Sequence, residues 1–197
     1  MSIKIIGPRD KYNGEYINTT SGSNNWSKGL SPFFLGPCDL YGNYKSLNVE
    51  NAWQYCKLYK EFADRNNDPT REYYDWAQEG WSKKHVDRYP MGKGAIPICS
   101  IWDGEKLDYI DARKKIYIPL YARAIIKTST FQVLKDEYEE KENLVLWDYD
   151  GYDHVKKGMT LQDVLNESKL KMGHAFVLVM LLENKIIVDK NEVIFNF

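Results

Sequence analysis

The alternation of apolar and polar positions predicts the clearest helix of the chain over residues 48–60. Apolar side chains recur there at helical spacing: Val49, Ala52, Trp53, Cys56 and Tyr59 or Lys60. Asn48 stands just before this face. It is suited to cap the helix, because its side-chain oxygen can accept a hydrogen bond from a free N–H of the first turn. The segment is therefore predicted to be a capped amphipathic helix.

Polar residues follow one side of this predicted helix, beside its apolar face. Glu50, Gln54 and Lys57 stand at positions i, i+4 and i+7. A rise of about 1.5 Å per residue puts the first and last of them roughly 10 Å apart. Glu50 also falls in the first turn, where the helix dipole favours a carboxylate. Glu50 and Lys57 can thus border one small-molecule pocket, and the alternative is a solvated polar face.

The same period predicts further helices over about residues 70–80, 107–127, 130–140 and 172–182. Pro119 should kink or divide the second of these, because proline lacks the N–H that an interior helical position uses. The last segment is apolar on all sides, which is typical of a helix buried in a protein core.

Short apolar runs bounded by turn residues predict strands, in the ranges 3–6, 97–102 and 143–147. A strand, a turn and a second strand are expected within residues 30–42, and a terminal hairpin over residues 185–197 turns at Lys190 and Asn191. Together with the helices, these elements predict an α+β fold. We expect a predominantly helical single domain with short strands over residues 1–197.

Net charge and composition limit the kinds of binding partner that we expect for this protein. The chain has 27 Lys and Arg against 28 Asp and Glu, a formal net charge of -1. A protein that wraps duplex DNA normally carries a basic excess, so extensive duplex wrapping is not expected. Aromatic residues make up 14% of the chain, and those outside the core can stack on a nucleobase.

The three cysteines, Cys38, Cys56 and Cys99, are widely spaced and form no CxxC pair. This pattern argues against a disulfide framework and favours a reducing compartment. The first residues are charged too early for a signal peptide, and no apolar run approaches the length of a membrane span. A cytoplasmic protein without membrane contact is expected.

The most distinctive loop is Tyr89–Pro97, in which Gly92 and Gly94 flank Lys93. Glycines let the backbone approach a ligand and direct N–H groups at an anion. The loop lacks the longer pattern of a Walker A motif. It is a candidate phosphate site, and the alternative is a tight structural turn.

A second candidate region follows the predicted strand 143–147, where Trp147, Asp148 and Asp150 enter a loop rich in acids. Loops that leave the end of a strand often carry sites on a rigid base. Gly173 and His174 open the apolar segment near the C-terminus and can present N–H groups or an imidazole to a ligand. The alternatives are an acidic surface turn and a hydrogen-bonded core histidine.

Several kinds of chemistry find little support in the spacing of residues. The histidines and cysteines do not stand at metal-ligand spacing, no nucleophile elbow is present, and Cys-His chemistry has no positive indication. No metal and no cofactor are expected. The remaining set of Glu50, lysines, aromatics and aspartates suits cleavage at an anomeric carbon. It suits equally a pocket that only binds a nucleotide-like ligand.

In sequence, the chain resembles the NADAR (YbiA-like) family at five segments that follow one another in the same order. These are Leu30–Phe34, Val49–Lys57, Gly92–Lys93 before Trp102, Trp147–Asp148, and the apolar segment from Met172. The second corresponds to the family's Val-Glu-His-Ala-Phe-Gln-x-x-Lys helix and is the most specific. Three positions depart from the family: Asn51 replaces its His, Lys93 its Arg, and Asp148 a usual Gly. The chain also resembles bacteriophage proteins associated with this group.

The resemblance implies a helical α+β fold of the NADAR type and activity on N-glycosidic bonds. The substrate would be a riboflavin-pathway intermediate or a guanine base carrying ADP-ribose in nucleic acid. In a phage, in infected host cytoplasm, the second activity would reverse DNA ADP-ribosylation by a DarT-type toxin.

By the same resemblance, Glu50 would act as acid or base or would orient the ribose. Asp148 or Asp150 would position water or stabilise the positive centre. Trp53 and Trp147 would wall the pocket, and Lys93 with its two glycines would hold phosphate. Lys57 would be a nucleophile or a charge partner. The alternatives are a binding protein that sequesters a nucleotide or blocks a host enzyme, and a glycosidase for another modified nucleotide.

Overall fold

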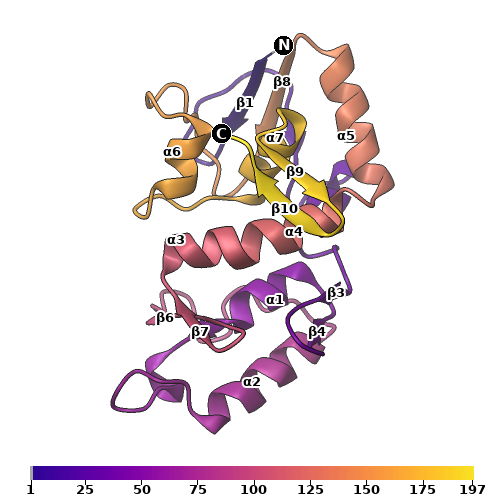
Figure 1. The fold of residues 1–197 in the computed structure, drawn as a ribbon. Coiled ribbons are helices and arrows are strands. Elements are labelled where there is room, and N and C mark those ends of the chain that lie inside the picture. Colours follow the sequence, from indigo (N-terminus) through magenta and orange to yellow (C-terminus); the bar gives the residue numbers. More distant parts are fainter. Residues whose placement is uncertain (1) are drawn as a thin grey trace. The chain divides into compact units, whose positions relative to one another are not determined.

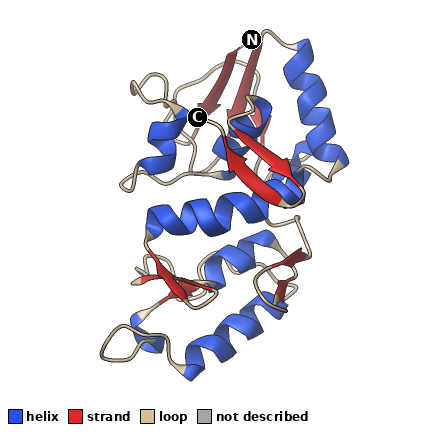
Figure 2. Cartoon of the chain, viewed as in Figure 1, coloured by secondary structure: helices blue, strands red, loops and turns tan. Residues whose placement is uncertain are grey.

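A computed structural model describes residues 2–197 and shows an α+β protein in which helices alternate with short strands (Figure 1, Figure 2). The chain divides into two compact units. Unit 1 comprises the chain up to Phe34 together with Tyr121–Phe197, and unit 2 is the intervening segment Leu35–Leu120. The α+β class is confirmed, and the single domain over residues 1–197 stays a prediction.

Unit 1 is built on a three-stranded parallel sheet with the order β1-β8-β2. The strands are β1 (Ser2–Ile6), β8 (Asn143–Trp147) and β2 (Ile17–Asn18). In the register of this sheet, Ile6 pairs with Trp147, and Trp147 pairs with Asn18. The predicted strands at 3–6 and 143–147 are thus confirmed. Because the strands are parallel, the loops that follow β1 and β8 leave at the same edge.

Helices and a hairpin complete unit 1 (Figure 1). They are η1 (Trp26–Leu30), α4 (Ile118–Ile125, in which the two units join), α5 (Ser129–Glu140), α6 (Leu161–Asn166), α7 (His174–Leu182), β9 (Ile186–Asp189) and β10 (Glu192–Phe195). Helix α7 packs against β1 and β9 and is almost wholly buried, as its uniform apolar composition predicts. The predicted terminal hairpin is confirmed, and Lys190 and Asn191 turn it with positive φ.

Unit 2 packs two helices with short antiparallel strand pairs. Its elements are β3 (Cys38–Asp39), β4 (Lys45–Ser46), α1 (Val49–Tyr55), β5 (Lys57–Leu58), η2 (Lys60–Phe62), α2 (Arg71–Ser82), β6 (Cys99–Trp102), β7 (Glu105–Leu107), α3 (Tyr109–Ala112) and the π-helical turn η3 (Arg113–Tyr117). A core of Tyr55, Leu58, Tyr73, Ala77, Trp81 and Ile101 lies between α1, α2 and strands β5 and β6.

The predicted helix at 48–60 begins where expected but ends earlier. The Asn48 side chain accepts from the Asn51 N–H at 2.7 Å, which confirms the cap. The chain leaves the helix after Tyr55, and Lys57 stands in β5, opposite Ser100 of β6. The placement of Lys57 on the helix was therefore wrong. Pairing with a strand more than forty residues away overrides the local period at this point.

Two further predictions differ from the structure. The helix expected from residue 107 starts at Tyr109, capped by Asp108, because the preceding residues pair with β6 as strand β7. A π-helical turn precedes Pro119, and such turns accommodate a break in the regular hydrogen-bond ladder. Between residues 30 and 42, only the short strand β3 forms, and Leu30 belongs to η1.

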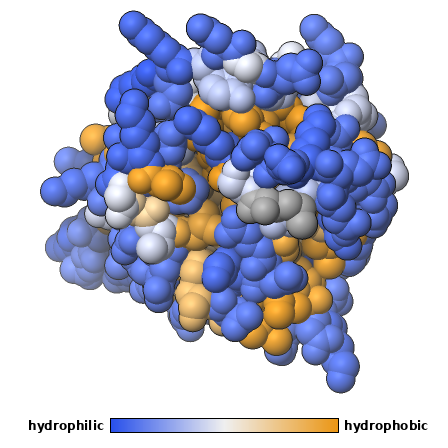
Figure 3. All heavy atoms as spheres, turned by 90° about the horizontal axis from the view of Figure 1, so that it is seen from above, coloured by the Kyte–Doolittle hydropathy of each residue, from blue (hydrophilic) through white to orange (hydrophobic). Residues whose placement is uncertain are grey.

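The surface retains apolar side chains among the charged ones. Figure 3 shows one face on which hydrophobic atoms are exposed between hydrophilic side chains. Exposed hydrophobic residues of the terminal hairpin include Ile187, Ile194 and Phe195. Within residues 2–197, no helix combines the length and the hydropathy that crossing a membrane requires.

Candidate functional site

The residues predicted for the site fall into two groups, one in each unit. Unit 2 holds Glu50, Trp53, Lys57, Gly92, Lys93 and Gly94, and unit 1 holds Trp147, Asp148, Asp150, Gly173 and His174. The two groups differ in how their carboxylates are held.

Glu50 lies in the first turn of α1 and is buried, with 6% of its surface exposed. Its Oε1 accepts a hydrogen bond from Gln54 Nε2 at 2.8 Å. The other end of that amide, Gln54 Oε1, accepts from Lys57 Nζ at 2.7 Å. A carboxylate, an amide and an ammonium thus form an ordered chain of side chains, although Lys57 has left the helix.

The two hydrogen bonds that join Lys57, Gln54 and Glu50 run in one direction. An ammonium group donates hydrogen bonds and accepts none, so Lys57 requires the oxygen of the Gln54 amide to face it. The amide nitrogen then faces Glu50 and donates to its Oε1. Oε1 of Glu50 is therefore held as an acceptor.

The ammonium of Lys57 also lies over an aromatic ring. Its Nζ is 4.8 Å from the centroid of the Trp53 ring, which suits a cation–π contact. Trp53 in turn packs against Tyr117, with ring centroids 5.2 Å apart. Of the two predicted roles, these contacts suit the charge partner, because the Lys57 ammonium donates to an amide oxygen and lies over an aromatic ring.

Asn51, in the middle of α1, has a structural role. Its Nδ2 donates to the carbonyl of His85 at 2.8 Å, and its Oδ1 accepts from the Asp87 N–H at 2.9 Å. The Asp87 carboxylate then accepts from Tyr55 Oη at 2.5 Å and pairs with Lys83 Nζ at 3.2 Å. The Tyr55 hydrogen bond lowers the pKa of Asp87. Sequence reasoning missed this cluster, because no spacing relates residues 51 and 87.

The Gly92–Gly94 loop is open and turns twice. The Gly92 N–H donates to the carbonyl of Tyr89 at 2.9 Å, and the Ala95 N–H to that of Gly92 at 3.2 Å. Both glycines have positive φ, +92° and +96°, and a Cβ on either would meet no other atom within 4 Å. Glycine is thus needed there for the backbone conformation alone. Lys93 is exposed and has no ion-pair partner among residues 2–197.

In unit 1, Asp148 follows β8 and is 3% exposed. Its Oδ2 accepts from the Ala175 N–H at 3.0 Å and lies 3.1 Å from His174 Nδ1. Its Oδ1 accepts from the Asp150 N–H at 3.3 Å. The second ring nitrogen of His174 lies 2.7 Å from the carbonyl oxygen of Thr19. Because both ring nitrogens face oxygen acceptors, His174 links β8, α7 and the segment after β2.

Close backbone contacts surround Asp148. A Cβ on Gly173 would lie 2.2 Å from Asp148 Oδ2, and one on Gly7 would lie 2.0 Å from the carbonyl oxygen of Gly151. Real Cβ atoms do not come so near to other atoms, so these positions need glycine for space. Because Gly173 has no side chain, the Asp148 carboxylate can lie against the start of α7. This geometry supports a positioning role for Asp148 and His174.

Two other residues of this group are more accessible. Asp150 is partly exposed, and its Oδ1 lies 3.9 Å from Lys171 Nζ. The Trp147 ring packs against Tyr149, with centroids 4.9 Å apart, and is also partly exposed. Of the two predicted aspartates, Asp150 is thus the better placed to meet a ligand.

Thiol and metal chemistry gain no support. The three cysteines are free thiols, as the sequence predicts. Burial raises the pKa of the Cys56 thiol to about 12, so it is not a thiolate near neutral pH. Across residues 2–197, no three His, Cys, Asp or Glu side chains are grouped to hold a metal ion.

The chain matches no known family model, no curated protein and no solved structure. The function is accordingly argued from the geometry of these two groups and from the motifs of the sequence.

Proposed function

We propose that the protein is an N-glycosyl hydrolase with a NADAR-type fold that removes ADP-ribose from a modified nucleobase, guanine in DNA above all. The single observation that supports this proposal is the ordered chain from Lys57 through Gln54 to the buried Glu50. In a phage, this activity would counter a DarT-type toxin.

The reaction replaces the bond between C1′ of the ribose and the base nitrogen with a bond from C1′ to a water oxygen. The departing base needs a proton, and the attacking water must lose one. Glu50 would supply the first proton and take up the second. Gln54 keeps Oε1 as an acceptor throughout. The positive charge of Lys57 would stabilise Glu50 in its ionised state between the two steps.

The other predicted residues would bind the substrate. The partly exposed face of Trp53 is suited to stack on a base or ribose. Lys93, with Gly92 and Gly94, would hold a phosphate group, because the lysine is exposed and the loop backbone is open. Asp150 and Trp147 stay predicted ligand contacts within unit 1, where Gly173 and His174 would hold Asp148 in place.

The test is Glu50→Gln, assayed for release of ADP-ribose from a modified oligonucleotide. The loss of one acid–base group should lower the rate by about 10²- to 10⁴-fold. Circular dichroism should show an unchanged fold. The control is Glu61→Gln, which alters an exposed carboxylate of the same unit and should keep full activity. Full activity of Glu50→Gln would exclude Glu50 from the reaction.

A second variant separates the two roles of Lys57. Arginine keeps the positive charge and can donate to Gln54, but it cannot act as an amine nucleophile. We therefore expect Lys57→Arg to keep a measurable part of the activity and Lys57→Met to lose it. An equal loss of activity in both variants would support the role of Lys57 as a nucleophile.

The second candidate is a protein that binds a nucleotide without turning it over. The exposed Lys93 with its open glycines favours it, because such a loop can hold an anion without any reaction. Calorimetry with ADP-ribose separates the two functions. Tight binding with no hydrolysis of any ADP-ribosylated substrate would identify the binder.

A further inference from the structure

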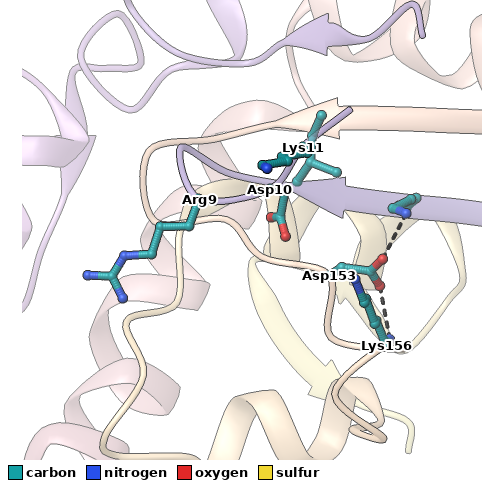
Figure 4. Close-up of a pocket in the computed structure, with 7 residues that line it drawn as sticks. Arg9, Asp10, Lys11, Asp153 and Lys156 are labelled. Atoms are coloured by element: carbon teal, nitrogen blue, oxygen red, sulfur yellow. Dashed lines mark hydrogen bonds and ion pairs between the residues drawn. The ribbon is translucent and has the colours of Figure 1, made fainter. Parts of the chain in front are cut away.

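A polar hollow of about 280 Å³ lies in unit 1, apart from the residues considered so far (Figure 4). It is formed by strand β1 with the loop after it, and by the loop after β8. The lining residues are Lys4, Ile6, Arg9, Asp10, Lys11, Asp153 and Lys156. It thus lies beside the edge of the sheet at which the parallel strands end, where open α/β sheets commonly bind their ligands.

The two loops that form the hollow are rigidly held. After β1, the Asp10 N–H donates to the carbonyl of Gly7 at 3.0 Å, and the Gly7 N–H donates back to Asp10 Oδ2 at 2.9 Å. The second loop touches this turn directly, since a Cβ on Gly7 would lie 2.0 Å from the carbonyl oxygen of Gly151. A hollow between two interlocked turns is preformed, so a ligand would not have to order it.

The lining carries an excess of positive charge. Four of its side chains are cationic and two are carboxylates, which leaves a formal charge of +2. The Lys4 ammonium forms an ion pair with the Asp153 carboxylate at 2.8 Å, and a dashed line marks this contact at Asp153 in Figure 4. The second carboxylate, Asp10, is bound to the backbone of its own turn.

Three cations of the lining have no such partner. Within residues 2–197, the structure pairs no carboxylate with the side-chain cations of Arg9, Lys11 or Lys156. The backbone N–H of Lys156 donates to Asp153 Oδ1 at 3.0 Å, a contact that Figure 4 also marks. In Figure 4 the Arg9 side chain extends away from the Lys4–Asp153 pair. Guanidinium and ammonium groups bind phosphate oxygens through charge-assisted hydrogen bonds, which are the strong ones.

We propose that this hollow is an anion site that binds a phosphate group of a nucleotide or of a nucleic-acid backbone. Its volume is just below the range of roughly 300–1,000 Å³ found for pockets of small molecules. It therefore suits a phosphate or diphosphate with part of a sugar. The site belongs to unit 1 alone and does not depend on the proposed hydrolysis.

The experiment measures the binding of three probes to the full chain: inorganic pyrophosphate, ADP and an unmodified single-stranded oligonucleotide. Arg9→Ala combined with Lys11→Ala should weaken binding at least about tenfold, since it removes two charge-assisted contacts. The control is Lys135→Ala, which removes an exposed lysine on α5 and should bind like the wild type. Both variants change exposed side chains, and equal melting temperatures would show that they fold.

A second variant, which removes a negative charge from the lining, is expected to change anion binding in the opposite direction. Asp10→Asn keeps an oxygen that can accept from Gly7 but removes a negative charge, so it should bind the anion more tightly. A hollow that binds a cation would give the reverse. Neither Arg9 nor Lys11 belongs to the proposed hydrolytic site, so loss of binding in the double variant tests this proposal separately from the proposed hydrolysis.

The probes also distinguish the two sources of phosphate. Binding of pyrophosphate and ADP identifies a free nucleotide. Binding of the oligonucleotide alone identifies backbone phosphates. It should weaken with salt, by a slope of about 0.7 per phosphate contacted in a plot of log affinity against log salt. If no probe binds the wild type, or if the double variant binds equally well, the proposal is wrong.

Discussion

Each unit of the molecule contains a buried carboxylate, and the two are held in different ways. Asp148 of unit 1 receives hydrogen bonds from two backbone N–H groups and faces the imidazole of His174. Glu50 of unit 2 is bound through Oε1 to a side chain, Gln54, which is itself bound to Lys57. Both residues are almost equally buried.

The difference lies in the donors. Backbone donors cannot move without moving the strand or helix that carries them, so Asp148 is part of the frame at the end of β8. The donor to Oε1 of Glu50 is the side chain of Gln54, which can turn without moving the helix.

Asp148→Ala is expected to have the largest effect on stability and tests this comparison most directly. The variant leaves the buried Ala175 N–H and His174 Nδ1 without their acceptor, and each buried polar group left without a partner costs about 1–3 kcal/mol. Urea unfolding followed by circular dichroism would measure it. Glu139→Ala, at an exposed carboxylate of the same unit, should change stability little. A small loss for Asp148→Ala would remove the distinction from Glu50.

The frame of unit 2 depends on aromatic packing, and Gly80→Ala tests it. A Cβ at this position would lie 2.0 Å from the ring of Tyr55, so α1 and α2 must move apart or the ring must shift. Such overpacking costs about 1–3 kcal/mol. The matched control is Gly22→Ala, where the nearest atom is 3.5 Å away. Equal melting temperatures for the two variants would show that the contact between α1 and α2 yields easily.

The smallest expected effect is a pH dependence in unit 1. Burial lowers the pKa of His154, which packs against Phe176, so the folded state binds its proton less readily than the unfolded chain does. The unfolded state therefore holds more protons once the pH falls below about 6.5, and stability should decrease there. Urea midpoints at pH 7.5 and 5.5 would measure the loss. It should be smaller in His154→Phe, and an equal loss in that variant would assign the effect to other groups.

Much of the fold could be predicted from the chain. The Asn48 cap, the strand that ends at Trp147 and the buried helix α7 are each indicated by a pattern within a few residues, although that strand pairs with the distant β1. The candidate residues Glu50 and Asp148 were also found, since each stands at the start or end of a predicted element. The sequence did not predict how these two carboxylates are held, because the partners of Asp148 include the distant residues 174 and 175 as well as residue 150.

The sequence by itself determined the class of the protein and the approximate positions of most of its helices and strands, because caps, periods and turn residues act over a few positions. Only the tertiary structure decided that Lys57 leaves its helix for a strand and still reaches Gln54. It alone brought Gly7 against Gly151 and placed cationic side chains around one hollow. The physical reason is that these contacts join segments up to about 145 residues apart. Their energies depend on packing and pairing, which no local pattern records.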